Sequence, residues 1–427
     1  MIKKILLFIL VFFLVFRPEF IFIPLGVNLF FGTLGFVVYC SDNKTRNKLF
    51  RLSHFSFAKI FKLFLPPLIC SFISLIINSS VDLYFPRYVI SMMFAFWAAY
   101  LLAWGFVRTY GELTCKKLAE YMIYGCVIYV LIALICFINP SLYAILNSLQ
   151  RMDEIAAESF DRTEGTRLIG IGANFYTSAI INGLILILMG VCIAIYKYSI
   201  LKKLILVFMF ILISVLALMM ARTVMFGILI GGVFLLSSFI RTSKDFYQAL
   251  FVTVLFLICI FVLVPILFKN YASDFEVLAS FGFEMFINKS QGGKMESHSM
   301  LHLYEMWATL PDNIKTWIFG DALWEYNGGY YKDVDLGYLR HLYYFGLIGT
   351  FFLFRCYYLT IKRIFLEKRL FSPKHKWVVF ALCVFVLILN AKGPCDLFLY
   401  IIPFYFCNNY MSQSRKQINA NRKKLIK

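Results

Sequence analysis

Long apolar runs recur from one end of the chain to the other, separated by short stretches that collect the charged residues. About 20 consecutive apolar residues are needed to cross the hydrocarbon core of a bilayer as an α-helix. We therefore predict an all-α fold, a polytopic membrane helix bundle of about twelve transmembrane helices in which the first and last are short. The runs lie at residues 5–16, 20–40, 60–78, 88–106, 119–138, 168–195, 204–220, 223–240, 248–268, 336–354, 377–391 and 397–408.

Composition supports one integral membrane domain. Of the 427 residues, 61% are hydrophobic and 15% charged, whereas a soluble domain is roughly half apolar and a quarter charged. We expect nine helices in residues 1–268, a large outer loop in residues 269–335, and three helices with a basic tail in residues 336–427. The eleven Cys lie mostly in apolar runs, which argues against a disulfide framework. The first run resembles a signal peptide, but no small-residue cleavage site follows, so we expect an uncleaved helix.

The net charge of +19 follows the predicted topology. With the N-terminus in the cytoplasm, most of the 42 Lys and Arg fall on the inner side and most of the 23 Asp and Glu on the outer side. This asymmetry is the positive-inside rule, so we expect both termini in the cytoplasm and no nucleic-acid partner. We interpret the inner basic clusters as orientation signals that contact anionic membrane lipids. They are Lys44/Arg46/Lys48/Arg51, Lys362/Arg363/Lys368/Arg369 and Arg422/Lys423/Lys424.

Two predicted outer segments are longer than ordinary connections, residues 139–167 and 269–335. Long loops on a compact bundle are usually functional or disordered. The second contains aromatic residues throughout, which favours a folded lid. Within it, the helical spacing of apolar residues over 296–309 predicts a short amphipathic helix, ended by Pro311 and Asp312.

Two arginines stand near the predicted outer surface of the membrane. Arg222 lies at the tip of a tight helical hairpin, and Arg167 closes the 139–167 segment, followed by Gly170, Gly172 and Asn174. A charge at a membrane edge is usually an interface anchor. The functional alternative is a fixed cation that binds phosphate, because a guanidinium is a planar fork of donors that stays charged. The glycines would let a ligand or another backbone segment approach closely.

Charged residues also cluster where the large loop enters its helix. Asp335 is either a residue favoured by the helix dipole or a group that accepts a proton from, or orients, a sugar hydroxyl. Arg340 and His341 fall in the second turn of the predicted helix, near the outer surface. His341 is as readily a partly buried interfacial histidine as an acid or base, so Asp335 ranks first.

Aromatic residues gather just before Asp335. Trp324, Tyr326, Tyr330 and Tyr331 surround an Asn-Gly-Gly sequence at 327–329. Aromatic faces beside amides and carboxylates suit carbohydrate, whereas the structural interpretation is a membrane-interface belt with loop packing.

A metal site is the weaker interpretation of another group. His298, His302 and Glu305 could share one helix face, but the HExxH motif is missing, and we expect no metal.

These residues resemble a known family. The sequence GD…Y…GGYYKDVDLGYLRHLYYFGLIG closes a long outer loop and runs into a helix. Together with the stretch around Arg167, Gly170 and Asn174, the hairpin arginine Arg222 and the roughly twelve-helix layout, it is similar to the O-antigen polymerase (Wzy-type) family of bacterial surface-polysaccharide assembly. The Asp-Leu-Gly-Tyr sequence that ends at Tyr338 fits these polymerases better than the related O-antigen ligases, which have a histidine late in the loop.

The resemblance implies an inverting glycosyltransferase, independent of metals and cofactors, in the bacterial inner membrane. It would transfer a glycan from undecaprenyl diphosphate to a lipid-linked repeat unit at the periplasmic face and use these two lipid-linked glycans as donor and acceptor. Catalysis would involve Arg167, Arg222 and Asp335, and substrate binding would involve Asn174, Trp324, Tyr330, Tyr331, Tyr338, Arg340 and His341. A chain-length regulator is a further expected partner, and its identity is left open.

Three rival functions remain open, and the nearest is a ligase. A ligase would move the finished chain to the lipid A core, and His341 keeps that alternative open. A flippase for lipid-linked sugars predicts charges deep in helices and short outer loops, whereas the predicted helices carry few charges and one outer loop is long. A structural scaffold would not need the clustered arginines and aromatic residues.

Overall fold

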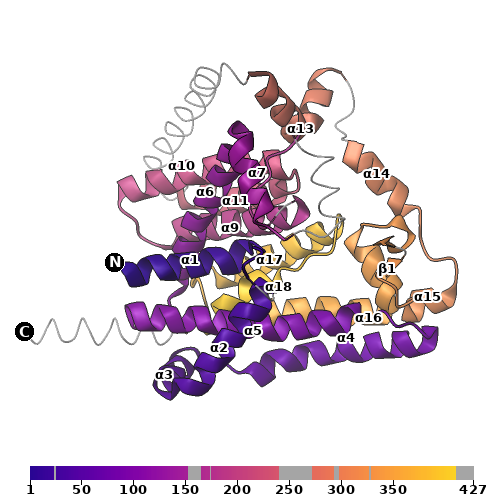
Figure 1. Ribbon diagram of the computed structural model, residues 1–427, viewed down its shortest axis with the longest axis horizontal. Coiled ribbons are helices and arrows are strands. Elements are labelled where there is room, and N and C mark those ends of the chain that lie inside the picture. Colours follow the sequence, from indigo (N-terminus) through magenta and orange to yellow (C-terminus); the bar gives the residue numbers. More distant parts are fainter. Residues whose placement is uncertain are drawn as a thin grey trace, which may run out of the picture. The chain divides into compact units, whose positions relative to one another are not determined.

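The computed structural model describes residues 1–23, 26–151, 165–173, 175–239, 272–292, 298–326 and 328–409, and these residues are mainly helical (Figure 1). The chain divides into two compact units. The first comprises Met1–Leu14, Leu25–Leu118 and His298–Lys427, and the second comprises Val15–Pro24 and Ala119–Ser297. The segment 269–335 is therefore divided between them, because its first helix belongs to the second unit and the part from His298 onward to the first.

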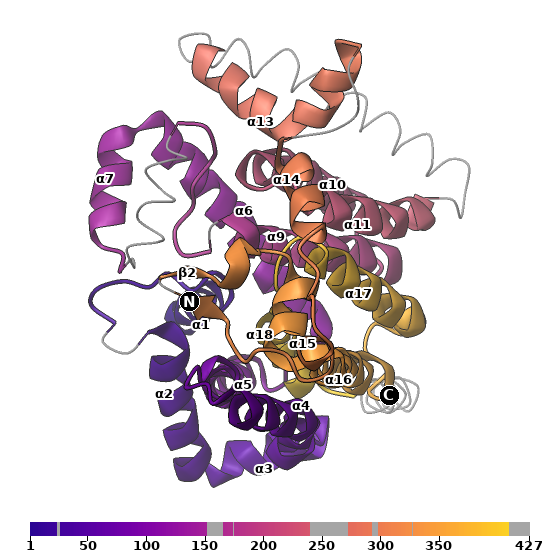
Figure 2. The same cartoon turned by 90° about the vertical axis from the view of Figure 1, so that its right-hand side faces the viewer.

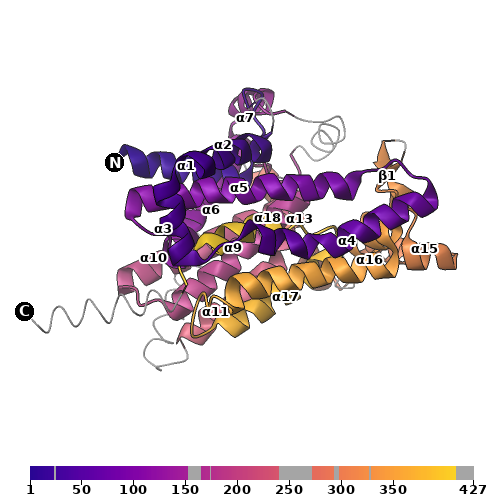
Figure 3. The same cartoon turned by 90° about the horizontal axis from the view of Figure 1, so that it is seen from below.

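Two helix pairs organise the first unit, α2 with α5 and α4 with α16 (Figure 3). Gly32 and Gly35 of α2 let its backbone approach α5, since a Cβ at Gly35 would lie 2.0 Å from the carbonyl oxygen of Trp97. Small residues at such positions are typical of helix pairs in membranes. The helices of this unit are α1 (Ile2–Phe16), α2 (Val27–Ser41), α3 (Asn43–Ser53), α4 (Phe57–Asn78), α5 (Tyr84–Tyr110), α14 (His298–Trp307), α15 (Ile314–Phe319), α16 (Gly337–Ile361), α17 (His375–Asn390) and α18 (Phe398–Ile401).

The second unit is built around α9, whose residues from Ser178 to Ile193 are all buried. It packs against α10 and α11, and glycines bring α9 and α11 together, with a Cβ at Gly190 only 2.1 Å from the carbonyl oxygen of Gly231. A further helix, α13, packs on α10 (Figure 2). The helices are α6 (Cys115–Ile138), α7 (Pro140–Ser148), α9 (Phe175–Ile195), α10 (Ile200–Met220), α11 (Val224–Phe239) and α13 (Ala272–Ser290).

Six helices of the described part are long and apolar enough to cross a membrane. They are α4, α5, α6, α9, α10 and α16 with its π-helical extension η3 (Lys362–Leu366). Three shorter apolar helices, α2, α11 and α17, accompany them. The expectation of a mainly helical fold is confirmed, and a helical membrane bundle agrees with these elements. The expected count of about twelve spans is not confirmed.

The predicted helices at 248–268 and 397–408 are not among these six long and three shorter apolar helices. The run 248–268 lies outside the described residues. The run 397–408 forms only the four-residue α18 and the 3₁₀ turn η4 (Ile402–Phe406), which is too short to span a bilayer. Pro403 stands near the start of that turn and has no N–H to continue α-helical hydrogen bonding.

Helix α16 is broken within the expected run 336–354. Gly346 has φ +68°, a left-handed conformation that favours glycine. A Cβ there would lie 2.1 Å from the carbonyl oxygen of Ile318, so the end of α15 fits directly against the break. The Ser74 hydroxyl donates to the carbonyl of Tyr344 over 2.9 Å, which satisfies one acceptor freed by the break.

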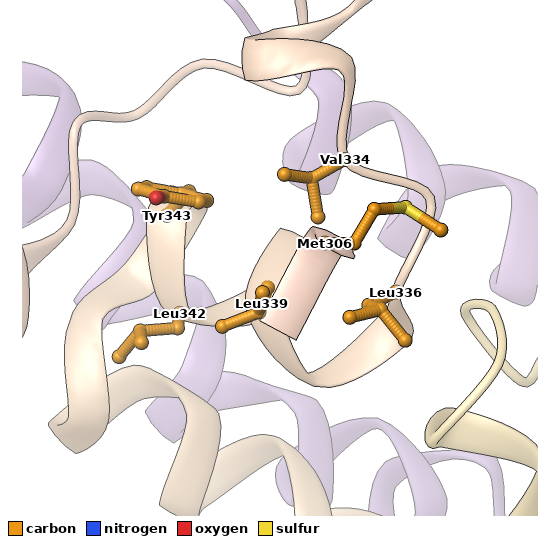
Figure 4. Close-up of a cluster of buried hydrophobic side chains, with 6 residues drawn as sticks. All are labelled: Met306, Val334, Leu336, Leu339, Leu342 and Tyr343. Atoms are coloured by element: carbon orange, nitrogen blue, oxygen red, sulfur yellow. The ribbon is translucent and has the colours of Figure 1, made fainter. Parts of the chain in front are cut away.

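The part of segment 269–335 that follows His298 packs onto the start of α16. Met306 of α14 packs with Val334, Leu336, Leu339, Leu342 and Tyr343 in one buried cluster (Figure 4). The amphipathic helix expected over 296–309 is confirmed as α14. After α15 the chain forms a small hairpin of β1 (Glu325–Tyr326) and β2 (Gly329–Tyr330), with Glu325 opposite Tyr330, then the 3₁₀ turn η2 (Tyr331–Asp333).

Candidate functional site

Arg167 and Arg222 come together in the second unit although 54 residues separate them in the sequence. Arg222 is the middle residue of the three that join Met220, the last residue of α10, to Val224, the first residue of α11. The residue after Arg167, Leu168, donates its N–H to the carbonyl of Met219 over 3.1 Å. This backbone hydrogen bond fixes the 165–173 stretch against the end of α10, so the two guanidinium groups share one site.

Helix α13 supplies the aromatic and acidic partners of these arginines. The Cζ atoms of Arg167 and Arg222 each lie 4.3 Å from the centroid of the Phe281 ring. One turn further along α13, the Glu284 carboxylate forms an ion pair with the Arg222 guanidinium. Positions three apart lie on one helix face, so α13 presents a ring and a carboxylate to the arginines together.

Burial and neighbouring charges shift the pKa values of both arginines. Burial, followed by the positive charge of Arg222, lowers the pKa of Arg167. Burial also lowers the pKa of Arg222, while Glu284 raises it. The Nε atom of each arginine is buried and has no hydrogen-bond partner among the described residues. Two partly desolvated cations with spare donors suit an anion with several oxygen acceptors.

A pocket of about 320 Å³ opens beside Arg167. Its walls come from the end of α6, from α7 and from the stretch that carries Arg167. The lining residues are Cys136, Phe137, Pro140, Tyr143, Gly165, Arg167 and Ile169. One guanidinium in a largely apolar and aromatic wall can hold a charged headgroup that carries an apolar chain.

The glycines after Arg167 have a packing role. A Cβ at Gly170 would lie 2.6 Å from the ring of Tyr129, and one at Gly172 would lie 2.3 Å from the carbonyl oxygen of Phe16. Gly172 also has φ +89°. The sequence left open whether these glycines let a ligand or another backbone segment approach closely. In the structure, the groups close to Gly170 and Gly172 are protein atoms of the same unit. Asn174 lies outside the described residues.

In the first unit, four planar groups form one stack. The rings of Tyr84 and Trp324 are parallel, with centroids 3.8 Å apart. The Arg340 guanidinium follows, with Cζ 4.0 Å from the centroids of both Trp324 and Tyr330. Arg340 also donates to the carbonyl of Trp324 over 3.2 Å, and the Asp82 carboxylate accepts from the N–H of Trp324 over 2.6 Å.

This stack determines which aromatic faces remain available. Tyr84 and Arg340 cover the two faces of Trp324, which is 5% exposed. Tyr330 has one face on Arg340 yet is 42% exposed, and Tyr326 of the same hairpin is 60% exposed. Tyr331 donates to Asp321 over 3.2 Å, and burial, followed by Asp321, raises its pKa to about 12. A sugar would therefore meet Tyr326 and Tyr330 before Trp324.

Asp335 lies just before α16. The cap residue of α16 is Leu336, and no side chain caps the helix. The N–H of Asp335 donates to the sulfur of Met306 over 3.2 Å. After burial, the charge of Asp335 is the next largest cause that raises the pKa of Tyr330, so the carboxylate acts electrostatically on the aromatic stack.

His341 is buried in the first unit, whereas Tyr338 is only half-buried and packs against neighbouring helices. His341 is 5% exposed, and its ring centroid lies 5.6 Å from that of Trp324. Tyr338 donates to the carbonyl of Leu387 over 2.7 Å and stacks on Phe354, so it joins α16 to α17.

The described residues contain no group of three or more His, Cys, Asp or Glu that could hold a metal ion. His298 and His302 lie on α14, but their side chains are outside the described part, so the metal question stays a prediction.

Sequence reasoning missed Phe281, Glu284 and Tyr84. The one available signal was the single acid in the otherwise apolar sequence FGFEMF of residues 281–286, which lies beyond the last expected helix before the loop. Nothing local to that sequence indicates Arg222 as its partner, because the pairing depends on how α13 packs against α10.

Comparisons with known proteins give this site no precedent: a scan against protein-family models, a search of curated proteins and a search of solved structures each found no match to the chain. Membership of the O-antigen polymerase family therefore stays a prediction.

Proposed function

We propose that this protein is a membrane glycosyltransferase of the O-antigen polymerase type. It transfers a growing glycan from undecaprenyl diphosphate to the non-reducing end of a new lipid-linked repeat unit, at the outer face of the bacterial inner membrane. The observation that carries the proposal is the convergence of Arg167 and Arg222 on Phe281, beside a pocket with an apolar wall. Such a site fits a diphosphate that is attached to a lipid.

The proposed reaction breaks one bond and forms one. The bond between the anomeric carbon and the diphosphate oxygen breaks, and the acceptor hydroxyl oxygen bonds to that carbon from the opposite side. The leaving diphosphate gains negative charge in the transition state, where preorganised cations stabilise it most. By analogy with other electrostatic stabilisers, loss of one arginine would slow the reaction on the order of 10²–10³-fold.

The acceptor requires orientation and at most one base. Asp335 stays the predicted base, and the hydroxyl proton passes to its carboxylate or to water. The exposed rings of Tyr326 and Tyr330 provide faces on which sugar C–H groups can stack. Positioning of the acceptor can supply a large share of the rate enhancement.

A glycan gel of a gene-deletion strain tests this function. The polymerase proposal predicts that long, laddered polysaccharide collapses to a single repeat on the lipid core, and that a plasmid copy restores the ladder. An unchanged ladder in the deletion strain contradicts the proposal.

The ligase is the second candidate, favoured by the buried imidazole of His341, which packs against Trp324. The same gel separates the two functions, because loss of a ligase removes all polysaccharide from the core and leaves polymer on the lipid carrier.

A further inference from the structure

Glu284 occupies the position that an anionic ligand of Arg222 would take. Its Oε2 atom pairs with Nη1 of Arg222, and the two side chains are 25% and 19% exposed. The helix that carries Glu284 packs on α10, since a Cβ at Gly282 would lie 3.5 Å from the backbone of Leu218. Helix α13 thus holds a carboxylate against the arginine site, which leaves the described group of two arginines and one glutamate with a net charge of one positive unit.

This charge balance affects which anions can bind. A phosphodiester headgroup carries one negative charge and must compete with a carboxylate of equal charge that is already in place. A lipid monophosphate carries about 1.5–2 negative charges at pH 7, but its single phosphate group cannot pair with Arg167 and also displace Glu284 from Arg222. A diphosphate has more charge and a second phosphate group, so it can pair with Arg167 while it displaces Glu284 from Arg222. Discrimination between ligands often depends on such a repulsive group as much as on an attractive one.

The surroundings of the site make such discrimination necessary. Two half-buried guanidinium groups with spare donors and no internal counter-ion would bind any phosphate within reach. A membrane surface presents phosphodiester headgroups at high local concentration. In an enzyme at that surface, ordinary lipid headgroups would therefore occupy such a site most of the time.

We propose that Glu284 is a specificity-determining residue that makes the Arg167–Arg222 site select a lipid diphosphate over lipid monophosphates and phosphodiesters. The inference rests on the proposed function for the identity of the diphosphate, since glycosyl transfer from a carrier lipid leaves that group on the lipid. Phe281 contributes by fixing both guanidinium groups on one ring, so that the spacing of the two cations is constant.

The experiment measures binding of farnesyl diphosphate and farnesyl phosphate to the purified full-length protein in detergent. The two probes share one apolar chain and differ by one phosphate. The native protein should prefer the diphosphate. In Glu284→Gln, binding of the monophosphate should tighten about tenfold and binding of the diphosphate much less, so that the preference falls.

Two further variants make the result specific. Glu284→Asp keeps the charge but shortens the side chain by one methylene, so its preference should lie between those of the native protein and Glu284→Gln. Glu276→Gln removes an exposed carboxylate from the same helix and should leave the preference unchanged.

An unchanged preference in folded Glu284→Gln or Glu284→Asp overturns the inference, as does failure of the native protein to prefer the diphosphate. The thermal unfolding midpoint of each variant reports whether it is folded. The outcome is separable from that of the proposed function. If deletion of the gene leaves the glycan ladder intact while Glu284→Gln loses its preference, the polymerase proposal fails and the selection of diphosphates stands.

Discussion

At the scale of single residues, the site contains two cations, Arg167 and Arg222, that repel each other. The Phe281 ring contacts both cations, and the Glu284 carboxylate pairs with Arg222. Burial lowers the pKa values of Arg167 and Arg222, which indicates that each cation is costly where it stands. Proteins keep such costly charges where a ligand or a reaction uses them. The two spare Nε donors favour the ligand interpretation.

The Phe281 ring tests this interpretation. Phe281→Leu keeps an apolar side chain but removes both cation–π contacts, each worth about 0.5–2 kcal/mol. The guanidinium groups should then lose their fixed spacing, and the KM for the lipid-linked donor should rise about tenfold with a smaller change in kcat. The matched control is Phe208→Leu, at an exposed phenylalanine of α10, for which both constants should equal the native values. A native KM in Phe281→Leu would show that the ring does not position the arginines.

At the scale of elements, the tip of the α10–α11 hairpin could be predicted from the sequence, because two apolar runs flank Arg222. The short helix α14 could be predicted as well, from its apolar spacing. The break in α16 could not, since Gly346 lies in an uninterrupted apolar run and only the contact with Ile318 of α15 reveals its role. The Arg222–Glu284 pair could not be predicted either, because it depends on a tertiary contact.

The break in α16 predicts a large effect of one methyl group. In Gly346→Ala the new Cβ would overlap the Ile318 carbonyl, and the residue would keep a left-handed φ. The free energy of unfolding should fall by at least about 2 kcal/mol. Gly232→Ala is the control, since a Cβ there meets nothing within 4 Å in α11 and should be neutral or slightly stabilising. Equal thermal unfolding midpoints for the two variants would contradict this account of the break.

At the scale of the whole molecule, charge asymmetry predicts the topology that the proposed function needs. Tyr326 of the β1–β2 hairpin should face the outside, and Arg51 of α3 should face the cytoplasm. Both side chains are exposed, so a cysteine at either position can react. In a chain with Cys40 replaced by Ser, a membrane-impermeant maleimide should label Tyr326→Cys in intact cells and Arg51→Cys only after lysis. The reverse pattern would place the aromatic hairpin on the wrong side of the membrane for this function.

The central claim is that Arg167 and Arg222 act together on a lipid diphosphate during glycan polymerisation. The most direct measurement is the glycan ladder of the deletion strain complemented with Arg167→Ala, Arg222→Ala or the control Arg87→Ala, an exposed arginine near the start of α5. With membrane levels of each variant matched to the native protein, the account predicts a full ladder for Arg87→Ala and a single repeat for each of the other two. A full ladder from either Arg167→Ala or Arg222→Ala would contradict it.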